Sequence, residues 1–355
     1  MKEFRKIGVL TSGGDAPGMN AAIRAVTRAA LSHGVEVVGI KRGYSGLIYG
    51  DIKPLGERDV SNIINRGGTF LYSDRCPEML TREGKERAVK TCKDNNIDGI
   101  VAIGGDGTFR GAMALTELGI PCIGIPGTID NDITATDRSI GFDTAMNTVV
   151  DIIDKLRETC ESHARCNVVE VMGRGAGDIA LYTGVATGAT ATVIPEIPYD
   201  ADDICTKIKE GRRAGKRNFI VVVSEGVGSK FAPLLAEKIN NESNVETKFA
   251  RLAHIVRGGE PTLRDRVLAS KMGVVAVEQL LEGKYNLVIC ERHGEIVATD
   301  INYALTADKM RKGIEFEKDE LESFSQEEIS SMRALVEERQ QKIEYMDKIA
   351  KKINI

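Results

Sequence analysis

The sequence predicts an α/β fold with two similar domains, each built on a mostly parallel sheet between layers of helices. Short apolar runs alternate with longer segments of helical periodicity along most of the chain, a pattern typical of parallel sheets. At 355 residues the chain is long enough for roughly two domains with separate cores. The alternation starts again in the second half without a fixed repeat length, which favours a second domain similar to the first.

In the first half, Ile7–Leu10 is a predicted strand, and Thr11–Gly18 a tight glycine-rich turn. Met19–His33 has helical spacing and is closed by Gly34, and Val35–Ile40 is the next strand. This order predicts a βαβ unit with a right-handed crossover. Backbone N–H groups in the turn can face a phosphate, although its spacing is neither GxGxxG nor a P-loop.

The strand Gly99–Ile103 leads into Gly104–Thr108 and a predicted helix from Phe109 to Leu118, closed by Gly119. The glycines around Asp106 leave room for a phosphate chain, but the carboxylate would repel it unless a cation bridges them. Mg²⁺ is the natural bridge, and a purely structural turn is the alternative.

Arg75 lies in the loop Ser73–Pro77, where it can reach a phosphate. A lone loop arginine is more often simply solvated, so this residue depends on its context.

Next, the apolar run Cys122–Ile125 ends in Pro126–Asp132. Thr128, Asp130 and Asp132 follow the strand end, where they can hold a hydroxyl, a base and a partner charge beside one substrate. The alternative is a polar turn that caps the following helix. Because ligands bind at the carboxyl edge of parallel sheets, the polar turns after these strands favour one binding region.

The second half begins with a helix after Asp137 that runs to about Ser162, and Gly173–Asp178 is another glycine-rich turn. The strands predicted there are Val168–Met172, Thr192–Ile194 and Phe219–Val223, with a helix over Asp202–Arg213. Further on, Leu263–Leu281 is an amphipathic helix, Leu287–Cys290 a strand, and Gln326–Ile355 a charged terminal helix with an apolar stripe. That stripe predicts packing on the body of the protein or on a partner subunit.

A local group of cations surrounds His254 and Arg257, which precede a glycine pair and lie near Arg251 and Lys248. In a chain with a net charge of −4 such a group suits a phosphomonoester. A solvated basic face is the alternative.

Composition restricts the function classes. The chain is 42% hydrophobic and 28% charged, which is ordinary for a globular protein, and its charge points to no nucleic acid or membrane partner. The charged start is unlike a signal peptide, and no apolar window is long enough to span a membrane. The seven scattered cysteines form no CxxC pair and have no zinc spacing with histidine, so we expect a cytoplasmic protein with reduced thiols.

Several long motifs occur in one order: IGVLTSGGDAPGMNAAIR, INRGGTF, IGGDGT, GIPGTIDNDI, VVEVMGR and HIVRGG. With them, residues 5–320 strongly resemble the bacterial ATP-dependent 6-phosphofructokinases. The resemblance implies transfer of the ATP γ-phosphoryl group to the 1-hydroxyl of fructose 6-phosphate in glycolysis, with Mg²⁺. It also implies two Rossmann-like three-layer domains with the active site in the cleft between them. The expected boundaries are 1–140 plus 255–308 for a larger ATP-binding domain, 141–254 plus 309–325 for a smaller sugar-phosphate domain, and 326–355 for a helical extension.

The roles of individual residues follow from the same resemblance. Asp130 matches the base, with Asp132, Thr128 and Arg174 as further catalytic residues. The ATP site is expected at Gly14, Tyr44, Arg75, Cys76, Gly105, Asp106, Gly107 and Thr108, with Asp106 linked to the metal. Fructose 6-phosphate contacts are expected from Thr128, Ile129, Asp130, Arg165, Met172, Gly173, Arg174, Glu225, Lys248, Arg251, His254 and Arg257.

The resemblance also implies a homo-oligomer, usually a tetramer, because Arg165 and Lys248 or Arg251 are expected to reach the site across a subunit interface. Lys248 stands where the family has an arginine, and lysine lacks the bidentate fork. Arg251 compensates for it if the segment is helical.

The regulatory site of the family is only partly retained. Arg24, Arg28 and Arg157 match its basic residues, but Glu57, Thr190 and Ala214 replace others. We therefore expect activation by ADP and inhibition by phosphoenolpyruvate to be weak or absent.

Three alternatives stay open. A pyrophosphate-dependent phosphofructokinase is one, although such relatives place Asp and Lys where this chain has Gly107 and Gly127, which favours ATP. Lipid and NAD kinases share the GGDGT turn but not TIDND or HIVRGG. A catalytically silent subunit that only binds sugar phosphates is the third, and intact acidic residues speak against it.

Overall fold

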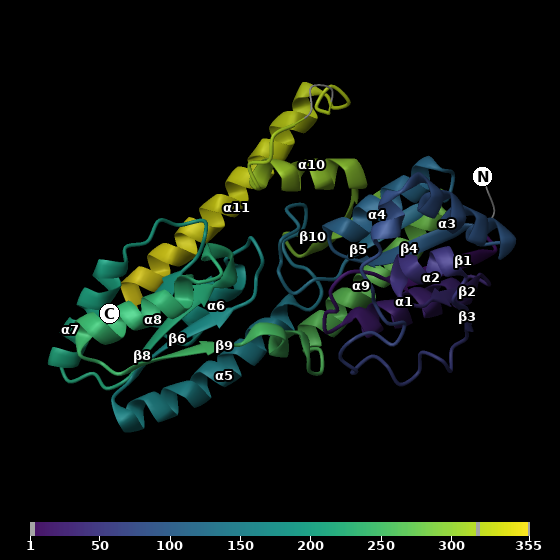
Figure 1. Cartoon of the computed structure of the whole chain (residues 1–355). Helices are drawn as coiled ribbons and strands as arrows, with labels where there is room; N and C mark the ends of the chain where they lie inside the picture. The colour runs from purple at the N-terminus through teal and green to yellow at the C-terminus, as the bar shows by residue number, and fades with distance from the viewer. Residues whose placement is uncertain (1–3, 317–319, 354–355) are drawn as a thin grey trace. The chain divides into compact units, whose positions relative to one another are not determined.

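The computed structural model describes residues 4–316 and 320–353 (Figure 1). The predictions that cover residues 1–3, 317–319 and 354–355 lie outside the described residues. The chain forms two compact units. Unit 1 contains the residues up to Ile129, then Ile133–Thr144 and Arg257–Val336; unit 2 contains Asp130–Asp132, Ala145–Val256 and the residues from Glu337 onward.

Unit 1 is built on a seven-stranded sheet in the order β11-β10-β5-β4-β1-β2-β3. Its strands are β1 (Lys6–Thr11), β2 (Glu36–Ile40), β3 (Ile52–Leu55), β4 (Gly99–Gly104), β5 (Cys122–Pro126), β10 (Leu287–Arg292) and β11 (Glu295–Asp300). Only the edge strands β3 and β11 pair antiparallel. The inner strands β4 and β5 are buried along their whole length, which explains why they read as continuous apolar runs.

Helices cover both faces of this sheet (Figure 1). On one side α1 (Met19–Ser32) packs against α9 (Leu263–Leu281), and on the other lie α2 (Gly43–Tyr49), α3 (Arg82–Asp94), α4 (Asp106–Glu117) and α10 (Ile301–Arg311). The close packing of α1 on α9 requires Gly273, because a Cβ atom there would lie 2.6 Å from the Cβ atom of Ala25.

Unit 2 has a four-stranded, wholly parallel sheet in the order β7-β8-β6-β9. Its strands are β6 (Cys166–Val171), β7 (Ala191–Val193), β8 (Phe219–Ser224) and β9 (Thr247–Arg251). Helices α7 (Ala201–Arg213) and α8 (Phe231–Ser243) share an apolar core with one face of the sheet. The other face is covered by α5 (Phe142–His163) and α6 (Asp178–Ala186).

The last helix, α11 (Gln326–Ile353), carries the predicted apolar stripe. Ile329, Met332, Leu335 and Ile343 are all buried. Unit 1 includes α11 up to Val336, and unit 2 includes the rest of the helix. The stripe therefore packs on the chain's own body.

The predicted strands and helices are confirmed to within a few residues, and α9 begins and ends as predicted. Helix α4 begins at Asp106 rather than Phe109, because Gly105 serves as its N-cap and an acidic side chain favours a first turn. Helix α5 begins at Phe142, five residues after Asp137. The additional elements α2, β3, α3, α8, β9, β11 and α10 had no prediction.

The segment around Lys248 and Arg251 is the strand β9, which pairs with β6 from Cys166↔Thr247 to Glu170↔Arg251. The condition under which Arg251 would compensate for Lys248, a helical segment, is therefore not met. One predicted domain boundary needs correction. The described residues of 309–325 belong to unit 1 rather than to the smaller domain, because α10 packs on α4.

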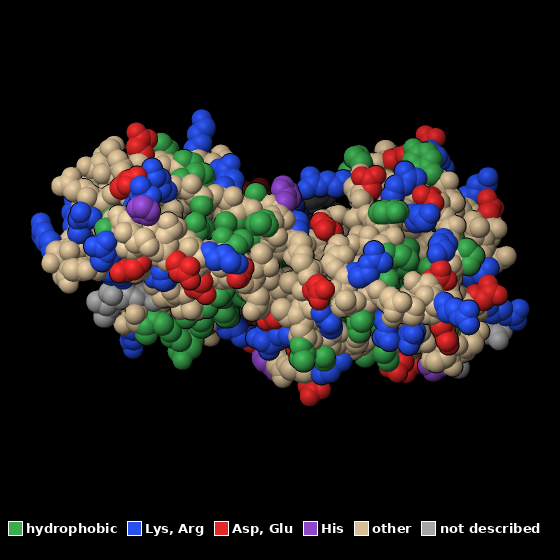
Figure 2. Space-filling model, turned by 90° about the horizontal axis from the view of Figure 1, so that it is seen from below, with side chains coloured by type: hydrophobic (Ala, Val, Ile, Leu, Met, Phe, Trp, Pro, Cys, Tyr) green, Lys and Arg blue, Asp and Glu red, His purple; other side chains and the backbone are tan. Residues whose placement is uncertain are grey.

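The described surface has a mixed charge. Figure 2 shows lysine and arginine interspersed with aspartate and glutamate over the face that it draws. No helix within the described ranges is long and apolar enough to cross a bilayer.

Candidate active site

The turns after β1, β4 and β5 lie together, as the sequence predicts for neighbouring strands of a parallel sheet. The amide of Ser12 donates to the carbonyl of Ile103 over 3.0 Å, and that of Gly127 donates to Gly104 over 2.9 Å. The hydroxyl of Thr108 donates to the Ser12 carbonyl over 3.1 Å. One polar edge is therefore built from three separate turns.

The turn Gly104–Thr108 leads directly into α4, and it is open where a phosphate chain needs space. A Cβ atom added at Gly105 or Gly107 would meet nothing within 4 Å. The amide of Gly107 donates to Asp106 Oδ1 over 2.8 Å, and Lys312 Nζ lies 3.6 Å from Asp106 Oδ2. Lys312 had no prediction, since nothing in its local sequence indicates that α10 ends beside this turn.

Tyr44, a predicted residue of the ATP site, packs under this turn and supports it. Its side chain is 3% exposed, and its hydroxyl donates to the Thr108 carbonyl over 2.6 Å. Burial raises the pKa of Tyr44, and a smaller contribution comes from Cys122. Thr108 itself is also buried.

The loop that carries Arg75 and Cys76 lies against the first glycine-rich turn. The hydroxyl of Ser73 donates to the Gly13 carbonyl over 2.5 Å, and the Gly13 amide donates to Asp74 over 3.4 Å. Arg75 is exposed and Cys76 is half-buried. Gly14 lies next to this contact, so the predicted ATP residues of unit 1 gather at one edge of its sheet.

The stretch Thr128–Asp132, called here the TIDND loop, is buried rather than solvated. Asp130 is 6% exposed and Asp132 is 3% exposed. Asn131 between them has φ 51°, a left-handed conformation that is uncommon for residues other than glycine. A simple polar cap would be solvated, so this burial argues against the capping alternative.

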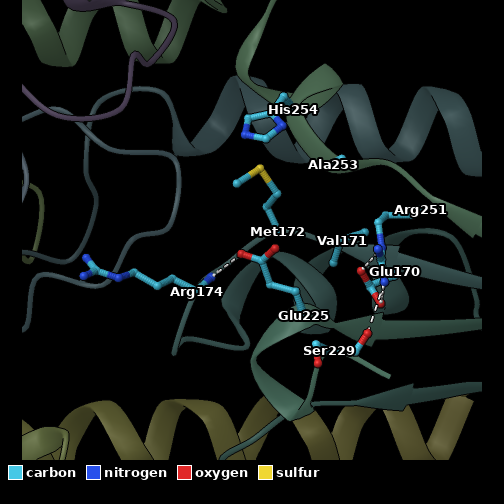
Figure 3. Close-up of a pocket in the computed structure, with 9 residues that line it drawn as sticks. All are labelled: Glu170, Val171, Met172, Arg174, Glu225, Ser229, Arg251, Ala253 and His254. Atoms are coloured by element: carbon cyan, nitrogen blue, oxygen red, sulfur yellow. Dashed lines mark hydrogen bonds and ion pairs between the residues drawn. The ribbon is translucent and has the colours of Figure 1, made fainter. Parts of the chain in front are cut away.

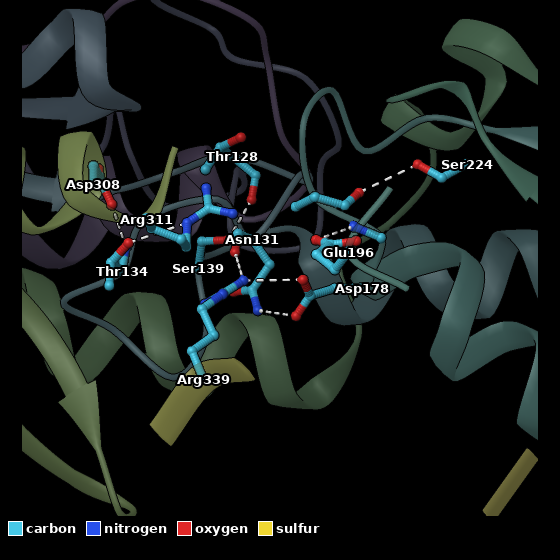
Figure 4. Close-up of polar contacts among 12 residues, drawn as sticks. Thr128, Asn131, Thr134, Ser139, Asp178, Glu196, Ser224, Asp308, Arg311 and Arg339 are labelled. Carbon is cyan, nitrogen blue, oxygen red and sulfur yellow. Dashed lines mark hydrogen bonds and ion pairs between the residues drawn. The ribbon is translucent and has the colours of Figure 1, made fainter. Parts of the chain in front are cut away.

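Polar contacts hold the loop at several points (Figure 4). The hydroxyl of Ser139 donates to the Thr128 carbonyl over 2.6 Å, and the Asn131 side-chain amide donates to Asp178 over 3.3 Å. Asp308 accepts the Thr134 amide over 2.5 Å. The side chain of Ile129 is fully buried, so its predicted substrate contact is restricted to backbone atoms.

Arg174 connects Asp132 to a pocket in unit 2. Its guanidinium group lies 3.8 Å from Asp132 Oδ2, and its backbone has φ 54°. Gly173 before it has φ 150°, and a Cβ atom there would lie 2.4 Å from the Ala176 carbonyl oxygen, so the turn requires glycine.

The pocket has a volume of about 470 Å³ and opens at the carboxyl ends of β6 and β9 (Figure 3). It is lined by Glu170, Val171, Met172, Arg174, Glu225, Ser229, Arg251, Ala253 and His254. Five of these, Met172, Arg174, Glu225, Arg251 and His254, are among the predicted substrate residues.

Polar contacts order the pocket lining. Arg251 Nε donates to Glu170 over 2.5 Å, and Glu225 accepts the backbone amide of Arg174 over 3.0 Å (Figure 3). The sequence analysis assigned no role to Glu170, although this residue lies in the VVEVMGR motif. The structure shows that Glu170 is only 5% exposed, and a carboxylate buried to this extent needs a charged or hydrogen-bonding partner.

Three predicted phosphate ligands lie outside this pocket. Arg165 and Lys248 both pair with Glu246, at 2.7 and 2.9 Å, at the other end of β6 and β9. These two cations hold the pKa of Glu246 at about 2, with the larger effect from Arg165. Arg257 belongs to unit 1, where it donates to the Asp15 carbonyl over 3.0 Å.

The predicted regulatory arginines are divided between the units. Arg24 and Arg28 lie on α1, and burial followed by the charge of Arg28 lowers the pKa of Arg24. Arg157 on α5 donates to the Asn218 side chain over 2.7 Å and to the Thr187 carbonyl.

Within the described ranges no cluster of three or more acidic, histidine or cysteine side chains could hold a metal ion. Asp106 is a single carboxylate beside an open turn, and Mg²⁺ is commonly held by one or two carboxylates together with substrate phosphates. The donor set thus fits Mg²⁺ that arrives with a nucleotide.

Taken together, these features define an α/β protein in which glycine-rich and polar turns follow the carboxyl ends of the strands, the edge at which ligands bind in parallel sheets. A family model described as phosphofructokinase matches residues 6–280. The chain belongs to the phosphofructokinase family, which confirms the resemblance inferred from its motifs.

Relatives of known name agree with this membership. The chain is 55% identical over 298 residues to the ATP-dependent 6-phosphofructokinase of Bacillus pumilus, with 84% of this chain and 93% of that protein covered. It is 53% identical over 306 residues to ATP-dependent 6-phosphofructokinase 1 of Clostridium perfringens, covering 86% and 95%.

Among solved structures, phosphofructokinase from Saccharomyces cerevisiae is similar with a TM-score of 0.82 and 32% identity over 88% of this chain. This chain spans only 46% of that yeast chain. A pyrophosphate-dependent phosphofructokinase from Marinobacter aquaeolei has a TM-score of 0.75 at 23% identity over 84% of this chain and 83% of its own, which shows a shared fold alone.

Proposed function

We propose that this chain acts as an ATP-dependent 6-phosphofructokinase, which forms fructose 1,6-bisphosphate and ADP. The observation that carries the proposal is Arg174, which lies 3.8 Å from the buried Asp132 and also lines the pocket that holds Arg251 and His254. A single side chain thus joins one of the two buried carboxylates to a site with the charge to bind a sugar phosphate.

In the proposed reaction, Asp130 takes the proton of the sugar 1-hydroxyl as its oxygen attacks the γ-phosphorus of ATP. The bond between that phosphorus and the bridging oxygen breaks, and ADP leaves with the electron pair. Catalysis of this kind requires mainly positioning and charge neutralisation. Asp132 and Arg174 orient the base, and Thr128 contacts the transferred group. Magnesium bound with ATP, next to Asp106, supplies further neutralisation of phosphate charge.

The donor site is proposed in unit 1, at Gly14, Arg75, Cys76 and the turn Gly105–Thr108. The acceptor is proposed to bind in the pocket of unit 2, with Glu225 on a sugar hydroxyl and Arg251 and His254 on the 6-phosphate. Open space at Gly107 favours ATP over pyrophosphate, because a larger donor needs that room.

We further propose a homo-oligomer, such as a tetramer. Arg165 and Lys248 point to the opposite end of β6 and β9 from the pocket, so they can complete a 6-phosphate site only in a neighbouring subunit. Arg257 is proposed to contact the same 6-phosphate, either in a neighbouring subunit or in its own chain. The described cysteines are all free, which suits a reducing cytoplasm.

The test is a coupled assay with fructose 6-phosphate and Mg²⁺ that compares ATP with pyrophosphate. Fructose 1,6-bisphosphate formation with ATP alone supports the proposal, and preferential use of pyrophosphate contradicts it. No product with either donor would instead indicate a silent sugar-phosphate-binding subunit. Added ADP or phosphoenolpyruvate is expected to leave the fructose 6-phosphate saturation curve in place, and a strong shift would show that the regulatory site works.

A further inference from the structure

Arg339 contacts the TIDND loop from a part of the chain that the family model does not include. The family match ends at residue 280, whereas Arg339 lies on α11. Its guanidinium group donates to the backbone carbonyl of Asn131 and to Asp178 Oδ2, the latter over 3.0 Å (Figure 4). The Arg339 side chain is only 11% exposed, so these contacts are made in a desolvated environment.

The three residues form a closed set of contacts within unit 2. Asp178, the first residue of α6, accepts from Arg339 through one oxygen and from the Asn131 side-chain amide through the other. Asn131 is therefore held by its side chain and its carbonyl at once. A residue in the left-handed region costs on the order of 1–3 kcal/mol and persists only when its surroundings hold it there.

Asn131 lies between the two carboxylates in sequence, so its backbone conformation sets their directions. A peptide plane that turns at Asn131 would redirect Asp132 and displace Asp130, and loss of about 1 Å in position can cost 10²-fold in rate. The guanidinium charge also lies beside a loop with two buried carboxylates, where an uncompensated negative charge is costly.

We propose that Arg339 is a positioning residue for phosphoryl transfer: it holds Asn131 and thereby keeps Asp130 and Asp132 in their working orientation. This inference rests on the proposed roles of the two aspartates. It makes the C-terminal helix α11 a part of the catalytic apparatus rather than an appended segment. The alternative is that Arg339 only anchors α11 to unit 2.

The first experiment compares Arg339→Ala with Arg333→Ala in the full-length protein. Arg333 is an exposed arginine on the same helix, so the control removes an identical side chain away from the loop. We expect Arg339→Ala to lower kcat by about 10- to 100-fold while KM for ATP changes less than about twofold. Arg333→Ala should leave both unchanged. A normal kcat for folded Arg339→Ala overturns the proposal.

A double-mutant comparison tests whether Arg339 acts through the loop. In an Asp130→Ser background, adding Arg339→Ala should lower the residual kcat by less than about twofold, because the group being positioned is already gone. A full additional loss would mean that Arg339 acts elsewhere and would contradict the inference.

Hydrogen exchange provides a measurement independent of activity, so failure of the proposed function does not obscure the result. Amides of residues 128–134 should exchange faster in Arg339→Ala than in Arg333→Ala, and unchanged exchange there overturns the proposal. If Arg339→Ala fails to fold, Arg339→Lys replaces it in all three experiments. Lysine keeps the charge but lacks the bidentate guanidinium group, so we expect smaller changes in kcat and in hydrogen exchange than for alanine.

Discussion

At the scale of single residues, burial distinguishes Asp130 and Asp132 from ordinary turn aspartates. Both are less than a tenth exposed, and the residue between them is held in a left-handed conformation. Turn aspartates are normally solvated, since a buried carboxylate needs partners. Burial of these two carboxylates costs folding free energy, so we expect them to have a function. The function that we propose is that of a proton acceptor beside a phosphoryl donor.

Replacing Asp130 by serine tests that role. Removing a general base lowers rates by about 10²–10⁴-fold, so Asp130→Ser should lose this much kcat while calorimetric binding of fructose 6-phosphate stays within a few-fold of wild type. Asp94→Ser, at an exposed position on α3, is the matched control and should behave as wild type. Near-normal turnover in Asp130→Ser would refute the assignment.

Gly107 allows a similarly direct test of donor choice. A Cβ atom at this position meets nothing within 4 Å, so Gly107→Asp should fold normally and place a carboxylate in the space that the donor phosphates need. We expect KM for ATP to rise by at least about tenfold, because one like-charge contact in a partly desolvated site costs more than 1.4 kcal/mol. Gly107→Ala is the uncharged control. Equal effects of the two variants would show that charge is not the cause.

At the scale of elements, β9 settles which basic residue faces the pocket. Successive side chains of a strand point to opposite faces, so Lys248 and Arg251, three positions apart, cannot share one. Arg251 lines the pocket and binds Glu170, whereas Lys248 pairs with Glu246. In a helix the two side chains would have been neighbours.

Arg251→Ala should therefore weaken binding of fructose 6-phosphate. A charge-assisted hydrogen bond contributes about 1.5–3 kcal/mol, which predicts a rise in KM for fructose 6-phosphate of about 10- to 100-fold. Lys207→Ala removes the same charge from the exposed surface of α7 in the same unit and should have no effect. An unchanged KM in Arg251→Ala would remove this residue from the acceptor site.

The N-termini of α5 and α9 stabilise one another through Asp265. Its carboxylate accepts hydrogen bonds from the amides of Gly141 and Thr144, at 3.0 and 2.9 Å, and from the Thr144 hydroxyl at 2.5 Å. Burial nevertheless raises the pKa of Asp265 from 3.8 to about 6, and the hydrogen bonds oppose that shift only in part. Folding therefore favours the protonated carboxyl group.

The sign of the resulting pH dependence follows from linkage. Because the folded pKa lies above the unfolded one, stability from Asp265 is fully present below the unfolded pKa and is lost as pH rises through about 6. Relative to Asp265→Asn, the free energy of unfolding of the wild type should fall by about 1 kcal/mol between pH 5 and 8. Urea unfolding of both proteins at the two pH values measures this difference, and a rise with pH would contradict it.

At the scale of the whole molecule, the basic residues at the amino ends of β6 and β9 favour an oligomer. Arg165 and Lys248 lie away from their own pocket and meet at Glu246, so the proposed 6-phosphate site takes them from a neighbouring chain. In a site shared between subunits, two different defective chains can together form one intact site, which a single variant cannot do.

Co-expression of Asp130→Ser with Arg165→Ala should restore activity that neither variant has alone. In a mixed pair, one site receives both defects and the other receives an intact Asp130 and an intact Arg165. Recovery of activity in purified mixed oligomers supports a site built across subunits. A mixture no more active than the sum of its parts would place Arg165 in its own chain's site or outside the site altogether.

Much of the architecture was predictable because its signals are local. Apolar runs that end in glycine-rich turns predicted the strands at the centre of both sheets, and the spacing of Leu263–Leu281 predicted α9 to the residue. The motifs GGDGT, TIDND, VVEVMGR and HIVRGG identified the family, and VVEVMGR and HIVRGG contain five of the nine residues that line the pocket. These patterns depend on period, turn chemistry and residue type, which are properties of the sequence itself.

What only the tertiary structure decided concerns contacts between distant segments. Lys312 beside Asp106, Glu170 beneath Arg251 and Arg339 on Asn131 each join elements far apart in the chain. Tyr44 likewise proved to be a buried support for a turn 64 residues away. No local pattern encodes such contacts, because they depend on how β4, β6, α10 and α11 pack, and packing is decided by the whole core at once. The sequence alone determined the chemistry of the site, and the fold decided which residues hold it in place.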